Sequence, residues 1–267
     1  MNDTAIKKSR LDSYSSRLQY WYVIRELTAR EIKRKYARSY LGILWSVLNP
    51  LLTMIVISAV FSTMFSKSIE NFPVYYLTGW IIWLLYSAGT RSSMTALSDN
   101  RSLLIKTKIP RIVFVLSRTY TEFVNFLFSC IAYAFILAFF RMEVSWTWLL
   151  FVVDIVFILL FSIGLGALLS ILYVFFPDVK HLYGVFLTML MYLSAIFYPV
   201  DRLPDVMAEV LDYNPVYMFI CFARVCIMEC DVPDMWVWAS SIGWSLGMFV
   251  LGMVAFKSRQ NDVMIHL

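Results

Sequence analysis

Six long apolar stretches constrain this chain more than any other feature of its sequence. They cover residues 42–65, 73–97, 112–140, 147–176, 182–199 and 236–256. A helix needs about 20 mainly apolar residues to cross the hydrocarbon core of a bilayer. Composition agrees, since 60% of the residues are hydrophobic and only 15% are charged. We therefore predict an all-α integral membrane protein in which residues 42–267 form one domain of six transmembrane helices.

Lysine and arginine are distributed unevenly around these stretches. If residues 1–41, 98–111, 177–181 and 257–267 share one side, that side and its helix ends hold 19 of the 23 basic residues. Positively charged loops stay cytoplasmic. We expect both termini in the cytoplasm. This topology also explains the net charge of +5, and no nucleic-acid-binding module is visible, so we expect no nucleic acid partner.

The segment before the first span has a pattern of its own. Residues 17–41 carry apolar and aromatic side chains at helical spacing, at Leu18, Tyr22, Arg25, Ala29, Ile32, Tyr36 and Tyr40, with Arg25 as the interruption. This pattern predicts an amphipathic helix along the cytoplasmic interface. Residues 1–16 are polar and lack the pattern of a cleaved signal peptide. We expect them to form a flexible cytoplasmic tail.

Two connections between spans carry apolar residues of their own. The basic loop 98–111 contains Leu103, Leu104 and Ile105, which suits the docking of a partner subunit; the alternative is a triplet that dips into the membrane interface. The external connection 200–235 has seven acidic residues and an apolar middle at 215–228. Fourteen residues are too few to span, so we predict re-entrant helices there, with prolines 204, 215 and 233 as breakpoints.

Signatures of soluble catalysis are absent from the sequence. None of the nine glycines is followed by lysine, and no GxSxG or HExxH occurs. The four cysteines form no CxxC pair and the two histidines lie far apart, so no metal site is predicted; a disulfide among Cys221, Cys226 and Cys230 would require an oxidising compartment. We predict that the chain is not an enzyme, holds no cofactor, and takes its energy from a partner or a gradient.

Ionisable residues inside the spans are few. Arg118 and Glu122 lie one helical turn apart, and we expect them to pair with each other. Asp154 lies near the external end of its span, and we expect it to reach the interface. Gly243 and Gly247 have the GxxxG spacing that allows close helix contact. Arg118, Glu122 and Asp154 are the few candidates for proton coupling.

Several motifs, in order along the chain, resemble a known family. They are REIKRKYARSYLGILWSVLNPLL, FPVYYLTGWIIW, NRSLLIKTKIPR, FPDVKHLYG and YPVDRLPD with a later Asn-Pro at 214–215. The chain is similar to membrane subunits of bacterial ABC transporters that export O-antigen, teichoic acid or capsule polysaccharide, from about residue 20 to residue 260.

The resemblance implies a homodimer that works with two copies of a cytoplasmic ATPase, which bind ATP and magnesium. The substrate would be a polysaccharide linked to a lipid such as undecaprenyl diphosphate, exported across the bacterial inner membrane and its lipids. The gate helix 17–41 would hold the lipid head group through Arg30, Lys33, Arg34, Lys35, Tyr36 and Arg38. The ATPase would contact Asn100, Arg101, Leu103, Leu104, Ile105, Lys106, Pro110 and Asp178. Trp45, Phe61, Tyr183, Phe186, Tyr192 and Phe197 would line the channel, although lipid-facing packing also explains such aromatic residues.

Three alternatives share parts of this pattern. An ABC exporter of another lipid or a drug would have nearly the same topology. A transporter driven by a gradient would depend on Asp154 or Glu122. A membrane-bound enzyme acting on glycans or lipids would need an acid/base constellation, for which Asp201, Asp205 and Asp212 are the visible candidates.

Overall fold

The chain is entirely helical in the part that the computed structural model describes, which is residues 2–37, 40–42, 44–65, 69, 71–107, 109–200 and 203–263. The helices are α1 (Asn2–Tyr36), α2 (Leu44–Phe65), α3 (Phe72–Met94), α4 (Ala96–Asp99), α5 (Arg101–Lys106), α6 (Ile112–Phe139), α7 (Trp148–Phe175), α8 (Val179–Tyr192), α9 (Asp205–Asp212), α10 (Pro215–Arg224) with the π-helical turn η2 (Val225–Glu229), and α11 (Met235–Arg259). The prediction of an all-α protein is confirmed.

The number of membrane spans differs from the prediction. Among the described residues, four helices are long and apolar enough to cross a membrane, namely α2, α6, α7 and α11. A bent pair before the last span, Val206–Asp212 with Pro215–Glu229, raises the number to five if it counts as one span. Six spans are therefore not confirmed. The predicted span 73–97 forms α3, which ends at Met94, and the start of α4. The tyrosine and tryptophan residues of α3 make it less apolar than the other four helices.

The predicted span 182–199 is helical only as far as Tyr192, where the 14-residue helix α8 ends. Beyond it the backbone turns, and Ala195 has a positive φ of 47°. The side chain of Asn214 stabilises this break by donating to the Leu193 carbonyl at 2.8 Å and to the Ser194 hydroxyl at 3.1 Å. The end of α8 is thus held by a residue that lies 20 positions further along the chain.

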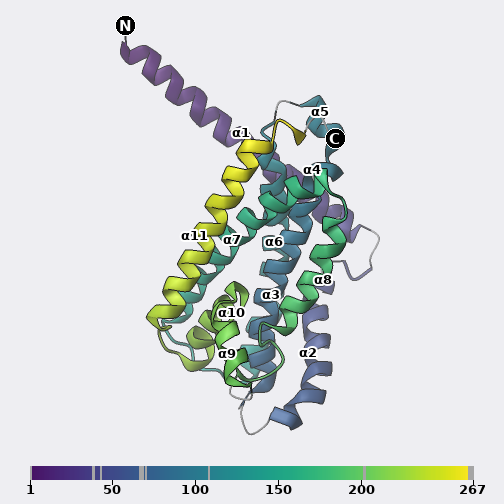
Figure 1. The fold of residues 1–267 in the computed structure, drawn as a ribbon, viewed down its shortest axis with the longest axis vertical. Coiled ribbons are helices and arrows are strands. Elements are labelled where there is room, and N and C mark those ends of the chain that lie inside the picture. The colour runs from purple at the N-terminus through teal and green to yellow at the C-terminus, as the bar shows by residue number, and fades with distance from the viewer. Residues whose placement is uncertain are drawn as a thin grey trace.

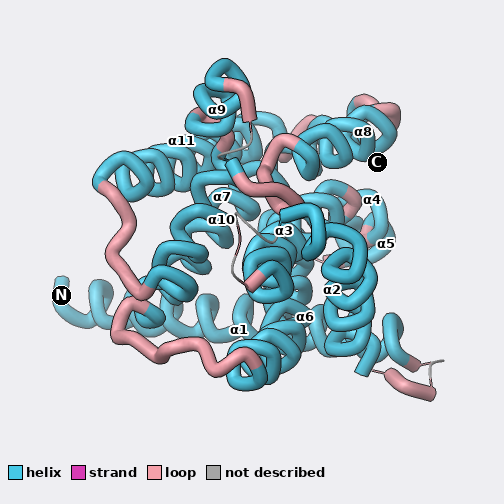
Figure 2. The backbone as a smooth tube through the Cα atoms, turned by 90° about the horizontal axis from the view of Figure 1, so that it is seen from below, coloured by secondary structure: helices cyan, strands magenta, loops and turns pink. Residues whose placement is uncertain are grey.

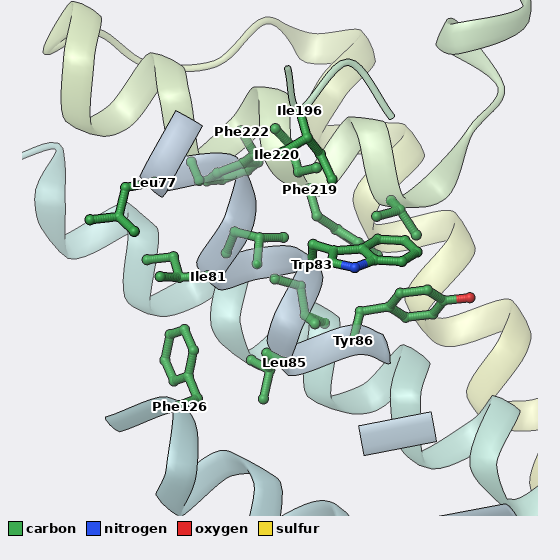
Figure 3. Packing of buried hydrophobic residues seen from close by; sticks show 14 of the residues in the cluster. Leu77, Ile81, Trp83, Leu85, Tyr86, Phe126, Ile196, Phe219, Ile220 and Phe222 are labelled. Atoms are coloured by element: carbon green, nitrogen blue, oxygen red, sulfur yellow. The ribbon is translucent and has the colours of Figure 1, made fainter. Parts of the chain in front are cut away.

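Helix α3 forms the centre of the molecule, as Figure 2 shows in a view along the bundle. Its side chains Leu77, Ile81 and Leu85 are at most 1% exposed. Figure 3 shows how they lie among Phe126 of α6 and Phe219 of α10 in the main apolar cluster. Most side chains of α3 are buried against other helices, which explains why this helix needs no strongly apolar surface.

Two glycines allow α7 and α11 to pack very closely. A Cβ atom at Gly164 would overlap the backbone of Met248, and one at Gly252 would overlap the backbone of Gly164. A Cβ at Gly243 or Gly247 would meet nothing within 4 Å. The GxxxG pair expected from the sequence therefore makes no close contact within the described chain, and α11 instead approaches α7 through the backbone of Met248, Phe249 and Gly252.

Helix α1 crosses one end of the bundle, where α4 and α5 also lie (Figure 1). We call this the α1 end, and the opposite end, where α9 lies, the α9 end. The helix extends over both the predicted tail 1–16 and most of the predicted gate helix 17–41, and it ends at Tyr36. Its buried side consists of Ile24, Leu27 and Thr28, whereas Tyr22 in the expected stripe is 60% exposed.

Candidate functional site

A cavity of about 260 Å³ lies where α1 meets α2, α3 and α6. We call it the α1 cavity. It brings together three residues that the sequence analysis assigned to two different sites, Lys35 and Tyr36 of the gate helix and Trp45 of the channel lining. Its remaining lining comes from α2, α3 and α6: Ser46, Asn49, Pro50, Leu84, Leu85, Ala88, Glu122, Asn125, Phe126 and Ser129.

A short chain of polar contacts joins α1 to α6 across this cavity. The Lys35 ammonium lies 3.9 Å from the Glu122 carboxylate. The Asn125 amide donates to the same carboxylate at 2.9 Å, and the Tyr36 hydroxyl donates to the Asn125 carbonyl oxygen at 3.2 Å. The Lys35 side chain is half exposed while that of Glu122 is 15% exposed. The cavity thus presents a half-exposed cation that lies 3.9 Å from an acid, next to amides and an indole ring.

Other basic residues of α1 are used elsewhere. Arg30 donates to the Asn100 side chain at 2.9 Å, and both Arg30 and Arg34 lie 3.6 Å from Glu31. Lys33 is exposed. Arg38, which was assigned to the same head-group site, lies outside the described residues.

The expected pair between Arg118 and Glu122 is wrong. Arg118 instead contacts two acids from other helices, Glu31 of α1 at 3.1 Å and Asp99 of α4 at 2.9 Å. Glu122 turns towards Lys35 and Asn125 in the α1 cavity. Packing of α1 along α6 brings in acceptors that the local sequence of α6 does not reveal.

The loop predicted to dock a partner forms the short helix α5, but its apolar triplet is divided. Leu104 is only 5% exposed and packs in a second apolar cluster with Leu27, Leu97 and Phe114. Ile105 is 61% exposed, which makes it the most exposed residue of the triplet. The other residues assigned to this contact divide in the same way: Arg101, Lys106 and Asp178 are exposed, Leu103 and Pro110 are partly buried, and Asn100 is buried.

The six aromatic residues assigned to a channel lie in different environments. Trp45, Phe186 and Tyr192 are about half exposed, at 47%, 49% and 59%. Tyr183 is buried and its hydroxyl donates to Thr90 at 2.6 Å. Phe61 stacks on Phe72, and Phe197 stacks on Tyr76. Trp45, Phe186 and Tyr192 are thus the most exposed of the six.

A groove between α3 and α8 contributes residues that the sequence analysis did not assign. Two adjoining hollows of about 370 Å³ and 310 Å³ share Arg91 and Thr188. The first also contains Lys180 and His181, and the second Ser87. Arg91 was visible in the sequence as a charge inside the predicted span 73–97, which is a signal for function in membrane segments.

At the α9 end a single arginine holds three segments together. Arg224 of α10 is 7% exposed, and its guanidinium lies 3.4 Å from the centre of the Tyr75 ring. It donates to the Tyr75 hydroxyl at 2.9 Å, to the Ala195 carbonyl at 3.0 Å and to the Ile196 carbonyl at 3.5 Å. Arg224 therefore fixes the broken end of α8 against the start of α3.

The remaining candidates for chemistry are buried or dispersed. Asp154 does not reach the interface as expected, since it is fully buried and neither carboxyl oxygen has a hydrogen-bond partner among the described residues. Its side of α7 faces the interior of the bundle. All four cysteines are free thiols. Within the described ranges no three potential metal ligands come together.

Comparison with known proteins assigns the chain to a family. The model of the ABC-2 type transporter family matches residues 22–228. An O-antigen export system permease protein, RfbA, of Myxococcus xanthus is 28% identical over 246 residues, which cover 91% of this chain and 95% of that protein. The polysialic acid transport protein KpsM of Escherichia coli is 21% identical over 258 residues, 90% of this chain and 95% of that protein.

A third relative covers a smaller part of the chain. The capsule polysaccharide export inner-membrane protein CtrC of Neisseria meningitidis is 26% identical over 196 residues, 70% of this chain and 72% of that protein. Members of the ABC-2 family are non-catalytic membrane subunits that work with a separate ATPase, which confirms that the chain is not itself an enzyme. The chain belongs to the ABC-2 type transporter family, as a multi-pass membrane subunit related to permeases of O-antigen, polysialic acid and capsule export.

Proposed function

We propose that this protein is the transmembrane subunit of an ATP-driven exporter that moves a lipid-linked polysaccharide, with undecaprenyl diphosphate as the expected carrier, across the bacterial inner membrane. The observation that carries the proposal is the α1 cavity, which places Lys35, Tyr36 and Trp45 together at the junction of α1 with the spans. The functions of the relatives, which export O-antigen, polysialic acid and capsule polysaccharide, support the choice of polysaccharide over a drug or another lipid.

The chemistry of the α1 cavity suits a phosphate-bearing head group. A cation at head-group depth attracts anionic lipid, and Lys35 has its counter-charge 3.9 Å away, which leaves room for a closer anion. Amide groups such as that of Asn125 can donate to phosphate or sugar oxygens. The indole of Trp45 offers an apolar face on which a sugar ring can stack.

The assembly follows from the same proposal. Two copies of the chain form the translocation path, and each binds one ATPase subunit, which holds ATP and magnesium. The end that carries α1, α4 and α5 faces the cytoplasm, because it contains most of the basic residues. The α9 end then faces outwards and covers the exit.

The decisive experiment measures ATP turnover by the complex. The chain is purified with the ATPase encoded beside its gene, and hydrolysis is followed as undecaprenyl-diphosphate-linked glycan is added. We expect stable co-purification and turnover that rises with the glycan. Lys35→Ala should weaken this response, and Lys257→Ala, at an exposed position near the end of α11, is the control. A chain that retains no ATPase, yet moves solute down a gradient in vesicles, would overturn the proposal.

Docking of the ATPase is tested separately at α5. Because Ile105 is exposed, Ile105→Asp should remove the ATPase from the purified complex without changing the thermal stability of the membrane subunit. Leu104→Asp serves as the contrast, since a charge in the second apolar cluster should destabilise the chain itself. Normal retention of the ATPase by the Ile105 variant would show that the contact lies elsewhere.

A further inference from the structure

The Arg118 bridge, which consists of Arg118 with Glu31 and Asp99, is not part of the α1 cavity. It connects three helices through one guanidinium: Nη1 lies 3.1 Å from Glu31 of α1, and Nη2 lies 2.9 Å from Asp99 of α4. Separate nitrogens of a rigid planar group therefore hold two separate acids, a geometry that a lysine ammonium reproduces poorly. The bridge ties α1 to the last residue of α4, two positions before α5 begins its first turn.

Burial makes this bridge stronger than an ordinary surface ion pair. The side chains of Arg118 and Glu31 are each only 11% exposed, while that of Asp99 is 45% exposed. Partly buried charges are screened less by salt than exposed ones. Glu31 also has Arg30 and Arg34 at 3.6 Å, but both are more exposed than Arg118. Arg118 and Glu31 thus form the fixed part of the bridge, and Asp99 is the arm that water can reach.

Neighbouring contacts extend the same connection. Arg30 donates to the Asn100 side chain at 2.9 Å, and Asn100 in turn donates to the Ala96 carbonyl at 2.8 Å. The Thr95 hydroxyl donates to the Asp99 carboxylate at 2.8 Å. The short segment before α5 is therefore internally rigid, and both of its polar ties lead to α1 or α6.

An apolar contact joins the same helices in addition to these polar contacts. Leu27 of α1 belongs to the same buried cluster as Leu97 of α4 and Leu104 of α5. Thr28 donates to the Ser117 carbonyl at 3.3 Å, next to Arg118. Helices α1, α4 and α5 hence share a packed and hydrogen-bonded junction on α6, so a displacement of one is transmitted to the others through rigid contacts.

We infer that Arg118 is a positioning residue that couples movement of α5 to movement of α1. The inference rests on the proposed function, in which α5 meets the ATPase and α1 contributes to the substrate cavity. When the ATPase moves α5, the bridge carries the displacement through Asp99, Arg118 and Glu31 to the part of α1 that ends at Lys35 and Tyr36. The link is independent of which lipid or glycan is carried.

The test follows α1 directly, without using substrate. The full complex with its ATPase is trapped with a nonhydrolysable ATP analogue, and amide hydrogen exchange is compared for residues 24–36 and 96–106. In the wild type we expect both segments to change on trapping, by about twofold to thirtyfold, the range over which mutations between coupled sites alter their coupling. In Arg118→Gln the change in 96–106 should persist and the change in 24–36 should be lost. Arg259→Gln, at an exposed pair with Asp262 3.4 Å away, is the matched control.

Further variants keep the inference falsifiable if Arg118→Gln fails to fold. Asp99→Asn alters the exposed arm and should lose most of the α1 response while leaving assembly with the ATPase intact. Glu31→Gln added to Asp99→Asn should cause little further loss, because residues acting through one contact are not additive. An undiminished response of residues 24–36 in Asp99→Asn or Arg118→Gln, or fully additive losses, would overturn the inference. Failure of glycan to stimulate turnover in a complex that shows the exchange coupling would count against the proposed substrate alone.

Discussion

The two ends of the bundle are held together by different kinds of contact. At the α1 end, acids and bases from α1, α4 and α6 form pairs, with Arg118 and Glu31 largely buried and Asp99 and Lys35 about half exposed. At the α9 end, Arg224 is buried and contacts backbone carbonyls and a tyrosine ring. Pairs that reach water can exchange partners at modest cost, whereas a buried guanidinium on carbonyls cannot. The comparison indicates that rearrangement is easier at the α1 end.

The largest expected effect comes from breaking the α9 end. Arg224→Met removes charge-assisted hydrogen bonds to four oxygens, those of the Tyr75 hydroxyl and of the Tyr75, Ala195 and Ile196 carbonyls. Because a hydrogen bond to a charged group contributes about 1.5–3 kcal/mol, we expect the loss of several such bonds to lower stability by about 3–5 kcal/mol, measured as a lower midpoint of thermal unfolding in detergent. Arg259→Met, whose side chain is 68% exposed, should leave the midpoint unchanged. Equal midpoints for both variants would mean that the α9 end is not held by Arg224.

A smaller effect on stability is expected at the close contact between α7 and α11, which belongs to neither end alone. Gly252→Ala would push α11 away from Gly164, and we expect it to cost about 1–3 kcal/mol. Gly247→Ala in the same helix meets open space, so the better helix propensity of alanine should raise stability by up to about 1 kcal/mol. Thermal unfolding of the two variants should therefore shift in opposite directions. A shift in the same direction would contradict the close packing at Gly252.

The smallest effect concerns salt and sharpens the contrast between the ends. Raising the salt from about 0.1 M to about 1 M shortens the Debye length from about 10 Å to about 3 Å. The half-exposed Lys35–Glu122 pair should weaken, and amide exchange near the end of α1 should accelerate by less than about fivefold, the equivalent of about 1 kcal/mol. Exchange in α10 should stay constant. If amide exchange accelerated in α10 and not near the end of α1, the α9 end would be the one that rearranges more easily.

The sequence predicted the helices that define their own ends and missed those that depend on distant residues. The apolar stretches 112–140, 147–176 and 236–256 correspond closely to α6, α7 and α11, because length and composition suffice for such helices. The end of α8 was misplaced because Asn214 and Arg224, which stabilise the break, lie far along the chain. A short stretch of sequence around α8 does not reveal the contacts that Asn214 and Arg224 make with it.

The candidate site was predictable to a similar degree. Lys35, Tyr36 and Trp45 were assigned by motif, and they do meet in one cavity. The partners of Arg118 and Glu122 could not be foreseen, since an i,i+4 pair within one helix gave way to acids and bases from α1 and α4. The division of the α5 triplet into buried Leu104 and exposed Ile105 likewise depends on where α1 packs.

The short helix α8 has a consequence for the surrounding lipid. Its 14 residues rise about 21 Å, about 9 Å less than the thickness of a typical hydrocarbon core. The turning backbone that follows is shielded by Arg224 and Asn214, as non-helical backbone at membrane depth must be. Hydrophobic mismatch of this size favours a locally thinner bilayer beside α8, at a cost of fractions of a kcal/mol per Å. We therefore expect the polar head groups to come closest together next to α8, where a polar cargo would have the shortest distance to cross.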